Sequence, residues 1–368
     1  MLLKDSVISK AVLILLCLSQ FFKVNHLFSH IYRVGGVFIK SLVDQIINNA
    51  YESMASDIHI TSSVNEGVVR FRVKGTMINY RVLNLETFKR LINYLKFIAE
   101  LDINEHKIPQ SGRTKFKINE RTLNLRISTL PLSLLRECVV IRLLNLNVSK
   151  ELTDLFYKED DYDILRSYMD KGQGLILFTG PTGSGKSTVM YKLAEEVANK
   201  GQRSIISIED PVEYEVDGLV QVEINEKANL KYAPLVRGVL RCDPDIIMFG
   251  EIRDKEIASE LIKTSLSGHL VLSTFHSKSA LSTLVRLKEY DLYKEEMIEA
   301  ISLIVNQRLI HTRDNSFIVY EYIEKEEIEK FLNDQAVNYT SVKDKLKIVY
   351  QEEGMSDEEY EYYNRIIE

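Results

Sequence analysis

"GPTGSGKST", residues 180–188, is the stretch of the sequence that decides the fold. It follows the apolar run "GLILF" and precedes "VMYKLAEEVANK", which gives the order strand, glycine-rich loop, helix. Glycines let a main chain curl around phosphate groups where a Cβ atom would collide, and the N–H groups at a helix start bind anions. The pattern predicts a P-loop that binds ATP or GTP; the alternative is a glycine turn without a ligand.

The loop residues are our predicted nucleotide contacts. Lys186 is expected to place a positive charge between the β and γ phosphates, and the Ser187 hydroxyl to ligate Mg²⁺. The cofactors expected are therefore ATP and Mg²⁺. The full set of predicted contacts is Gly180, Pro181, Thr182, Gly183, Ser184, Gly185, Lys186, Ser187 and Thr188.

Length and composition suit a soluble globular protein of two domains, or of one domain with a substantial satellite. The chain has 368 residues, of which 45% are hydrophobic and 27% charged, so wholesale disorder is excluded. A net charge of −6 argues against a surface that binds nucleic acid, and we expect no direct nucleic-acid partner. Cys17, Cys138 and Cys242 are far apart and form no C-x-x-C pair. Neither a disulfide framework nor a cysteine zinc site is indicated, which favours a cytoplasmic setting.

Residues 11–22, "AVLILLCLSQFF", form an apolar run too short for a membrane span of roughly 20 residues. Lys4 and Lys10 precede it as in a signal peptide, yet no A-x-A-like cleavage site follows. We interpret residues 1–37 as a leader or an over-extended start outside the domains, and expect the native chain to begin near residue 38. The alternative is a membrane-surface anchor.

Residues 38–150 are predicted to form a compact α/β domain. Apolar residues recur at helical spacing in "FIKSLVDQIINNAYESM" and "LETFKRLINYLKFIAELDI". Strand-like alternation marks "ASDIHI", "GVVRFRVKGTMINYRVL", "RTLNLRISTLPLS" and "ECVVIRLLN". An acidic, helical linker is expected over residues 151–172.

The second domain is predicted over residues 173–325, with strands and helices in alternation. The runs "SIISIED", "DIIMFGE" and "HLVLSTF" are short and almost entirely apolar, as in a parallel sheet covered on both faces. "FIVYEYIE" indicates one more strand, and residues 326–368 an acidic helical tail. The fold class is therefore α/β, a P-loop parallel-sheet domain preceded by a smaller domain.

Three side chains at strand ends are the predicted catalytic groups. Glu251 ends "DIIMFGE", Glu209 with Asp210 ends "SIISIED", and His276 follows "HLVLSTF". The carboxyl ends of parallel strands meet at the edge that faces bound phosphates. Glu209 and Glu251 are expected to orient the attacking water or to hold Mg²⁺ together with Ser187, and His276 to contact the γ-phosphate. Alone, each would be interpreted as an acid at a helix start or as a structural histidine.

Several motifs together resemble a known family, the bacterial secretion and pilus-assembly ATPases of type II secretion, type IV pili and competence. The likeness covers residues 38–325. Ser111 stands where the family usually has Asp, and "FHSKSA" replaces the commoner L-H-T-N-D-A. The motifs, in the family's order, are "ASDIHI" (55–60), "PQSGR" (109–113), "RISTLP" (126–131), the Walker A loop (180–188), "IEDPVEY" (208–214), "LRCDPDIIMFGEIRD" (240–254), "SGHLVLSTFHS" (267–277) and "QRL" (307–309).

The resemblance implies a RecA-like ATPase domain behind a PAS-like N-terminal domain, assembled as a homo-hexamer. It implies that Arg113, Arg126 and Arg142 of the N-terminal domain are candidates to bind nucleotide; the alternative for each is a solvated or ion-paired surface arginine. The family's tetracysteine zinc insert is missing, so no zinc is expected and the chain resembles the short competence-type motor.

The expected partners are a polytopic inner-membrane platform protein and, indirectly, pilin-like subunits, with the motor peripheral at the inner face of the membrane. A type II secretion, other pilus or conjugation-type ATPase is the nearest alternative. A nucleotide-binding scaffold that does not hydrolyse ATP is the alternative from a different class.

Overall fold

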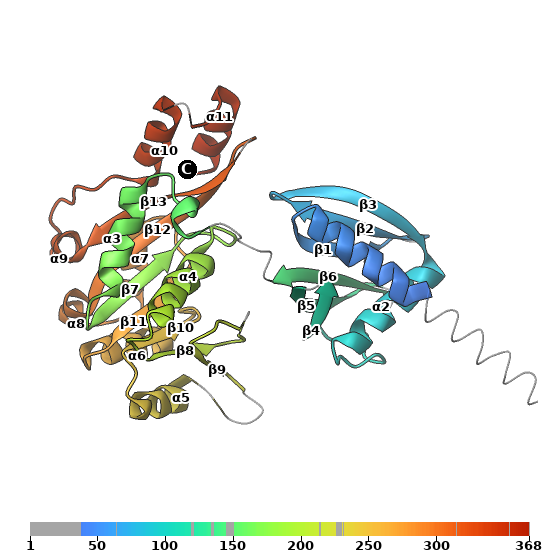
Figure 1. Cartoon of the computed structure of the whole chain (residues 1–368), viewed down its shortest axis with the longest axis horizontal. Helices are drawn as coiled ribbons and strands as arrows, with labels where there is room; N and C mark the ends of the chain where they lie inside the picture. The colour runs from blue at the N-terminus through green and yellow to red at the C-terminus, as the bar shows by residue number, and fades with distance from the viewer. Residues whose placement is uncertain are drawn as a thin grey trace, which may run out of the picture. The chain divides into compact units, whose positions relative to one another are not determined.

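The structure, a computed structural model, describes residues 38–367 except 64, 119–120, 134–135, 145–150, 213–214, 226–229, 231, 314 and 353. The predicted leader, residues 1–37, lies outside the described residues. The chain divides after Leu146 into two compact units (Figure 1). Among the described helices, none has the length and apolar character needed to cross a membrane.

The N-terminal unit is a six-stranded antiparallel sheet with the order β3-β2-β1-β6-β5-β4. A helix over residues 38–52 and α2, Leu85–Ile98, belong to the same unit (Figure 1). The strands are β1 (Ala55–Ser62), β2 (Glu66–Val73), β3 (Thr76–Asn84), β4 (Gln110–Ile118), β5 (Arg121–Leu132) and β6 (Arg136–Leu144). Our sequence interpretation assigned no strand to β4.

One face of this sheet is apolar because side chains along a strand alternate between the two faces. Ile58, Leu125, Ile127 and Ile141 are almost fully buried and share one core with apolar residues of both helices. The opposite face carries the polar members of the same strands. The Asn84 side chain accepts a hydrogen bond from the Thr87 N–H at 2.8 Å and so caps the start of α2.

The C-terminal unit contains a seven-stranded sheet with the order β13-β12-β7-β11-β10-β8-β9. Every neighbouring pair is parallel except β12 with β13. The strands are β7 (Gly174–Thr179), β8 (Ile205–Glu209), β9 (Val220–Glu223), β10 (Ile246–Phe249), β11 (Leu270–Phe275), β12 (Ile301–His311) and β13 (Ser316–Glu324). The predicted α/β class and parallel core are confirmed.

Helices pack on both faces of this sheet, so its central strands are buried throughout (Figure 1). They are α3 (Glu159–Met169), α4 (Lys186–Asn199), α5 (Tyr232–Val239), α6 (Lys255–Leu266), α7 (Ala280–Glu289), α8 (Lys294–Ala300), α9 (Lys325–Leu332), α10 (Val342–Gln351) and α11 (Asp357–Ile366), with short 3-10 turns η2 (Thr153–Leu155) and η4 (Leu240–Cys242). Among the described residues, two large apolar clusters line the central strands, and a third, smaller one lies where α10 and α11 pack on β12 and β13.

The segments on either side of the predicted ATPase domain are part of its core. Leu152, Leu165 and Met169, within the predicted linker, are buried in the same cluster as β7 and α4. Leu346 of α10 and Tyr363 of α11 are buried against apolar residues of β12 and β13. The C-terminal unit therefore extends from about residue 151 through α11.

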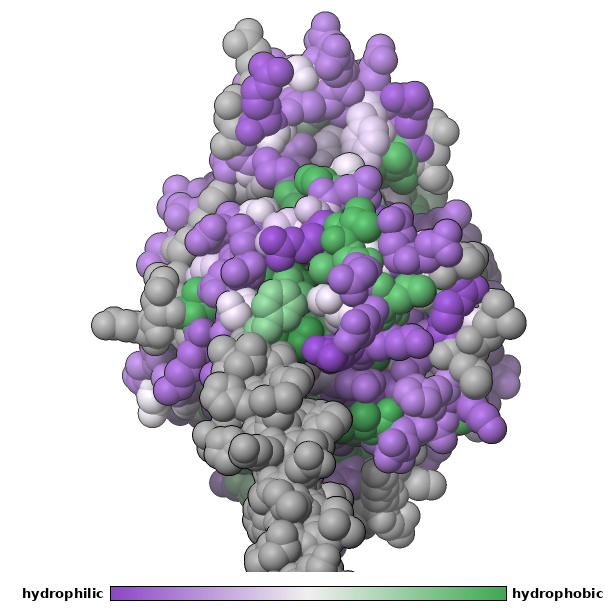
Figure 2. Space-filling view, turned by 90° about the vertical axis from the view of Figure 1, so that its right-hand side faces the viewer, coloured by the Kyte–Doolittle hydropathy of each residue, from purple (hydrophilic) through white to green (hydrophobic). Residues whose placement is uncertain are grey.

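The surface outside these cores is mixed. Figure 2 shows hydrophilic residues over most of the face drawn there, with small hydrophobic areas between them. Apolar side chains such as Phe97, 66% exposed, and Phe38, 59% exposed, contribute to the surface. Single exposed apolar side chains of this kind are common on protein surfaces.

Candidate functional site

The glycine-rich loop follows β7 directly, as predicted, and leads into α4. Gly180 has φ +141, and a Cβ atom at this position would lie 2.6 Å from the Gln307 carbonyl oxygen. Gly185 caps α4 in the left-handed region at φ 84. The Gln307 side chain donates a hydrogen bond to the Ser184 carbonyl at 2.8 Å. Backbone conformation and a close approach to β12 thus require glycine in this loop.

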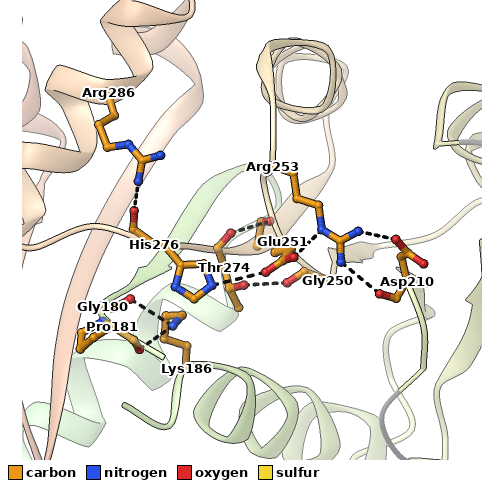
Figure 3. Close-up of polar contacts among 11 residues, drawn as sticks. Gly180, Pro181, Lys186, Asp210, Gly250, Glu251, Arg253, Thr274, His276 and Arg286 are labelled. Carbon is orange, nitrogen blue, oxygen red and sulfur yellow. Dashed lines mark hydrogen bonds and ion pairs between the residues drawn. The ribbon is translucent and has the colours of Figure 1, made fainter. Parts of the chain in front are cut away.

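Lys186 begins α4 and folds back over the loop. Its side-chain amine donates to the Gly180 and Pro181 carbonyls at 3.1 and 2.9 Å (Figure 3). Burial lowers the pKa of Lys186 to about 8, because both of these partners are uncharged and do not compensate the desolvated cation. The buried Ser184 hydroxyl has no hydrogen-bond partner within the described part of the chain. A buried, uncompensated cation beside an open hydroxyl fits an anion such as a phosphate group.

Glu251 and His276 meet at the carboxyl edge of the sheet, as their positions after β10 and β11 predicted. The His276 Nε2 atom lies 3.4 Å from the Glu251 carboxylate, which is 31% exposed (Figure 3). Burial alone would raise the pKa of Glu251, but the Arg253 guanidinium and His276 together hold this pKa below its usual value. Lys186 is close enough to feel the charge of Glu251. A charged carboxylate beside a phosphate site is suited to orient a water molecule.

Arg253, which the sequence analysis did not single out, joins two acidic residues that follow neighbouring strands. Its guanidinium contacts the Glu251 carboxylate through Nε and the Asp210 carboxylate through Nη1, and Nη2 donates to the Asp210 carbonyl at 3.2 Å (Figure 3). The contacts thereby tie the end of β8 to the end of β10. Asp210 lies in the motif "IEDPVEY", and Arg253 lies in the motif "LRCDPDIIMFGEIRD". These two motifs were the sequence signal that could have pointed to the contact.

The loop that carries His276 is held from α7. The Arg286 guanidinium donates to the His276 carbonyl, and it lies 4.7 Å from the centre of the Phe275 ring. Thr274 donates to the Gly250 carbonyl at 2.7 Å, which joins β11 to the segment before Glu251 (Figure 3). These contacts position the imidazole relative to the carboxylate.

Glu209 does not join this group. Its carboxylate, only 2% exposed, accepts hydrogen bonds from Tyr191, from Ser207 at 2.6 Å and from Gln221 at 3.0 Å. Three donors on a buried carboxylate indicate a structural connection between α4, β8 and β9. The next residue, Asp210, is the one that reaches Arg253. The arrangement therefore does not support the predicted catalytic and metal-binding roles of Glu209.

The three predicted arginines form a row across the polar face of the N-terminal sheet. Arg113 of β4 lies opposite Arg126 of β5, which lies opposite Arg142 of β6. Arg142 lies opposite Asp57 of β1 and donates to its carboxylate at 2.9 Å, and Arg72 of β2 is the next residue in the row. Arg126 donates to the Ser111 hydroxyl at 3.2 Å. The register thus places four arginines and one aspartate side by side across this face.

Among the described residues, no cluster of three or more His, Cys, Asp or Glu side chains is arranged to hold a metal ion. Mg²⁺ takes few protein ligands when it binds with phosphates, commonly one or two side chains and several waters. Ser187 at the start of α4 and the partly exposed Glu251 carboxylate fit such a site.

The strand–loop–helix unit with its buried lysine, at the carboxyl edge of a parallel sheet, defines a P-loop protein of the α/β class. The chain belongs to the type II/IV secretion system protein family, whose model matches residues 34–364. The resemblance inferred from the motifs is therefore confirmed.

Curated relatives and a solved structure extend the comparison. The chain is 36% identical over 275 residues to the type II secretion system ATPase E of Vibrio cholerae, covering 74% of this chain and 54% of the relative. It is 36% identical over 274 residues to the competence protein ComGA of Bacillus subtilis, covering 74% of this chain and 76% of that protein. The chain thus spans about half the length of the type II relatives it matches, 54% in five of them.

The fold is shared with the ATPase DotB of Legionella pneumophila. Its structure superposes with a TM-score of 0.70 over 88% of this chain and 95% of the other, at 20% sequence identity. At that identity the likeness concerns the fold alone.

Proposed function

We propose that this chain is an ATP-hydrolysing P-loop motor that powers the assembly of a type IV-like pilus or pseudopilus. The observation that carries the proposal is the convergence of Lys186, Glu251 and His276 at the carboxyl edge of β7, β10 and β11. A phosphate-binding loop alone serves binding, whereas an exposed carboxylate beside it serves hydrolysis.

The roles follow from position. The loop N–H groups and Lys186 bind and orient the β and γ phosphates, and Ser187 and Glu251 are the side chains that would hold Mg²⁺. When bound, Mg²⁺ would neutralise part of the negative charge of the phosphates. Glu251 accepts a hydrogen bond from the attacking water, and His276 holds the Glu251 carboxylate in place and contacts the γ-phosphate.

The arginine row is proposed to complete the site in a homo-hexamer. Phosphoryl transfer is accelerated when a guanidinium from another domain or subunit neutralises the developing charge. Arg113, Arg126 and Arg142 share one face in adjacent strands, which supports a joint role in binding a polyanion.

The system served is proposed to be a competence pilus for DNA uptake, with a polytopic inner-membrane platform protein as the partner and the motor at the cytoplasmic face of the membrane. The similarity to the competence protein ComGA, which this chain covers over 76% of its length, favours this system. Type II secretion is the second candidate, favoured by the similarity to the type II secretion ATPase E.

The test is the change Glu251→Gln, which keeps the shape of the side chain and removes its charge. We expect ATP binding to be retained and kcat to fall by about 10²–10³-fold. The matched control is Glu256→Gln, an exposed carboxylate in the first turn of α6, which should leave kcat unchanged. A Glu251→Gln protein that hydrolyses ATP at the wild-type rate would contradict the proposal.

A cellular assay separates the candidate systems. Cells that carry Glu251→Gln at normal protein level should lose both surface pilin and DNA transformation if the motor drives a competence pilus. Loss of secreted enzymes with transformation intact would assign the motor to type II secretion instead.

A further inference from the structure

A buried carboxylate outside the catalytic group connects two helices to the sheet. Glu321 lies in β13 and is 2% exposed. One carboxylate oxygen accepts the Ala280 N–H at 2.6 Å and the other accepts the Val342 N–H at 2.9 Å. Ala280 is the first residue of α7, and Val342 is the first residue of α10. A single side chain thus satisfies backbone donors at the starts of two helices.

The first of these helices directly follows the loop of His276. Only residues 277–279 separate His276 from Ala280, and Arg286 of α7 binds the His276 carbonyl. The position of α7 therefore fixes the position of the imidazole relative to Glu251.

Glu321 also continues a buried polar row that leads to the P-loop. It lies opposite Asn306 of β12, which lies opposite Thr179 at the end of β7. The Asn306 amide donates to the Thr179 hydroxyl at 2.9 Å and to the Ser277 carbonyl at 3.3 Å. The next residue, Gln307, binds the Ser184 carbonyl of the P-loop. Strand β12 therefore contacts the P-loop and the His276 loop at the same time.

Arg308 strengthens this connection. Its guanidinium donates to the Lys278 carbonyl at 2.6 Å and to the Asn306 side chain at 2.8 Å. Burial raises the pKa of Glu321, while the two N–H donors and the charge of Arg308 oppose that rise.

The second helix belongs to the C-terminal helical pair, α10 and α11. The pair packs on β12 and β13 through Val342, Leu346 and Tyr363 (Figure 1). A displacement of α10 would pull on the Glu321 carboxylate, and through it on the first turn of α7.

We propose that Glu321 is a positioning residue for the His276 loop and couples the α10–α11 pair to ATP turnover. The inference rests on the proposed function. A load or partner that moves this helical pair would change kcat through Glu321 without contacting the nucleotide, because both ends of the connection share one carboxylate.

Two substitutions in the full-length chain test the coupling. Glu321→Gln leaves one acceptor oxygen for two N–H donors, so one helix start loses its partner. Val342→Pro removes the Val342 N–H donor at a first helical position where proline is tolerated, and it replaces one buried apolar side chain by another. The matched control is Ser341→Ala, which removes the N-cap of α10 and its contact with Asp344 but leaves Glu321 and both of its donors unchanged.

We expect Glu321→Gln and Val342→Pro each to lower kcat by about 3- to 30-fold, with the KM for ATP within about twofold of wild type. Hydrogen exchange should accelerate in residues 276–283 of both variants, but only in residues 343–347 of Ser341→Ala, in which Val342 keeps its bond to Glu321 and kcat should stay at the wild-type value. Val342→Pro keeps the test decisive if Glu321→Gln fails to fold.

Two results would overturn the coupling: wild-type kcat and wild-type exchange of residues 276–283 in Val342→Pro, or an equal loss of kcat in Ser341→Ala. Failure of the proposed function is distinguishable, because the wild-type protein itself would then not hydrolyse ATP. The exchange of residues 276–283 would still report whether the connection between α10 and α7 exists.

Discussion

Two buried lysines, one in each unit, are held in opposite ways. Lys96 of α2 is fully buried and pairs with the Glu137 carboxylate at 2.6 Å, and it also donates to the Glu105 carbonyl at 2.7 Å. Lys186 of α4 is 7% exposed, and its hydrogen bonds within the described part of the chain go to the carbonyls of Gly180 and Pro181. The first cation is neutralised inside the protein, and the second is not.

The difference separates a structural lysine from one prepared for a ligand. The Glu137 carboxylate, itself 6% exposed, also lies 2.7 Å from the His106 Nδ1 atom. Lys96, Glu137 and His106 therefore join α2, β6 and the segment before β4. A buried charge without an opposite charge is costly, and a protein retains it where a ligand supplies the compensation. Burial by itself therefore does not identify a functional lysine; the partner does.

The largest expected effect is on activity. Lys186→Met removes the uncompensated cation, so we expect kcat/KM for ATP to fall by about 10³-fold. The thermal midpoint without nucleotide should equal or exceed the wild-type value, since a desolvated charge is lost. Steady-state ATPase assays and calorimetry would measure both quantities.

The matched control is Lys192→Met, which removes a partly exposed lysine of the same helix that pairs with Glu195 at 3.3 Å. It should leave both quantities unchanged. A Lys186→Met protein that is less stable and still active would erase the distinction between the two lysines.

The second effect is on stability. Lys96→Met leaves the buried Glu137 without its lysine and with His106 as its remaining partner, and we expect the free energy of unfolding of the N-terminal unit to fall by about 3 kcal/mol. Denaturant titration of the full chain would measure the loss. The double change Lys96→Met with Glu137→Gln should recover much of it, because no uncompensated charge remains. Equal stabilities of the single and double variants would contradict the assignment.

The smallest effect concerns the arginine row. Arg126→Ala should lower kcat of the assembled protein by about tenfold while leaving ATP binding intact, because Arg126 is proposed to act on the phosphate charge that develops during transfer. Arg136→Ala is the control, an arginine outside the row that donates to the Ser133 carbonyl at 3.2 Å. If both variants have equal kcat, the row has no role in turnover.

Most of the fold could be predicted from sequence because the central strands of the C-terminal unit are continuous apolar runs and most strands of the N-terminal unit alternate regularly. β12 was missed, and the reason is its centre: Asn306 and Gln307 are polar, yet both are almost fully buried. β4 was missed because Lys115 and Lys117 lie exposed on either side of a half-buried Phe116, which weakens the apolar signal. Polarity indicates exposure on average, and these positions are exceptions supported by hydrogen bonds.

The site was predictable where it depends on strand ends and not where it depends on side-chain direction. Glu251 and His276 meet because their strands end at the same edge. Glu209 and Asp210 are adjacent, but successive side chains of a strand point to opposite faces. Glu209 therefore meets Tyr191, and Asp210 meets Arg253. A difference of one position in the sequence therefore decides whether a carboxylate reaches Arg253 at the site. The periodicity of the strand does not show which of the two residues faces the site.

The arginine row depends on registry, and this constrains insertions and deletions more than substitutions. Adding one residue within β5 ahead of Arg126 would turn that side chain toward the core and bring Ile127 to the polar face. Adding one residue in the turn at residues 74–75, between β2 and β3, would leave the pairing of β4, β5 and β6 untouched. We therefore expect β4, β5 and β6 to tolerate substitutions more readily than insertions or deletions.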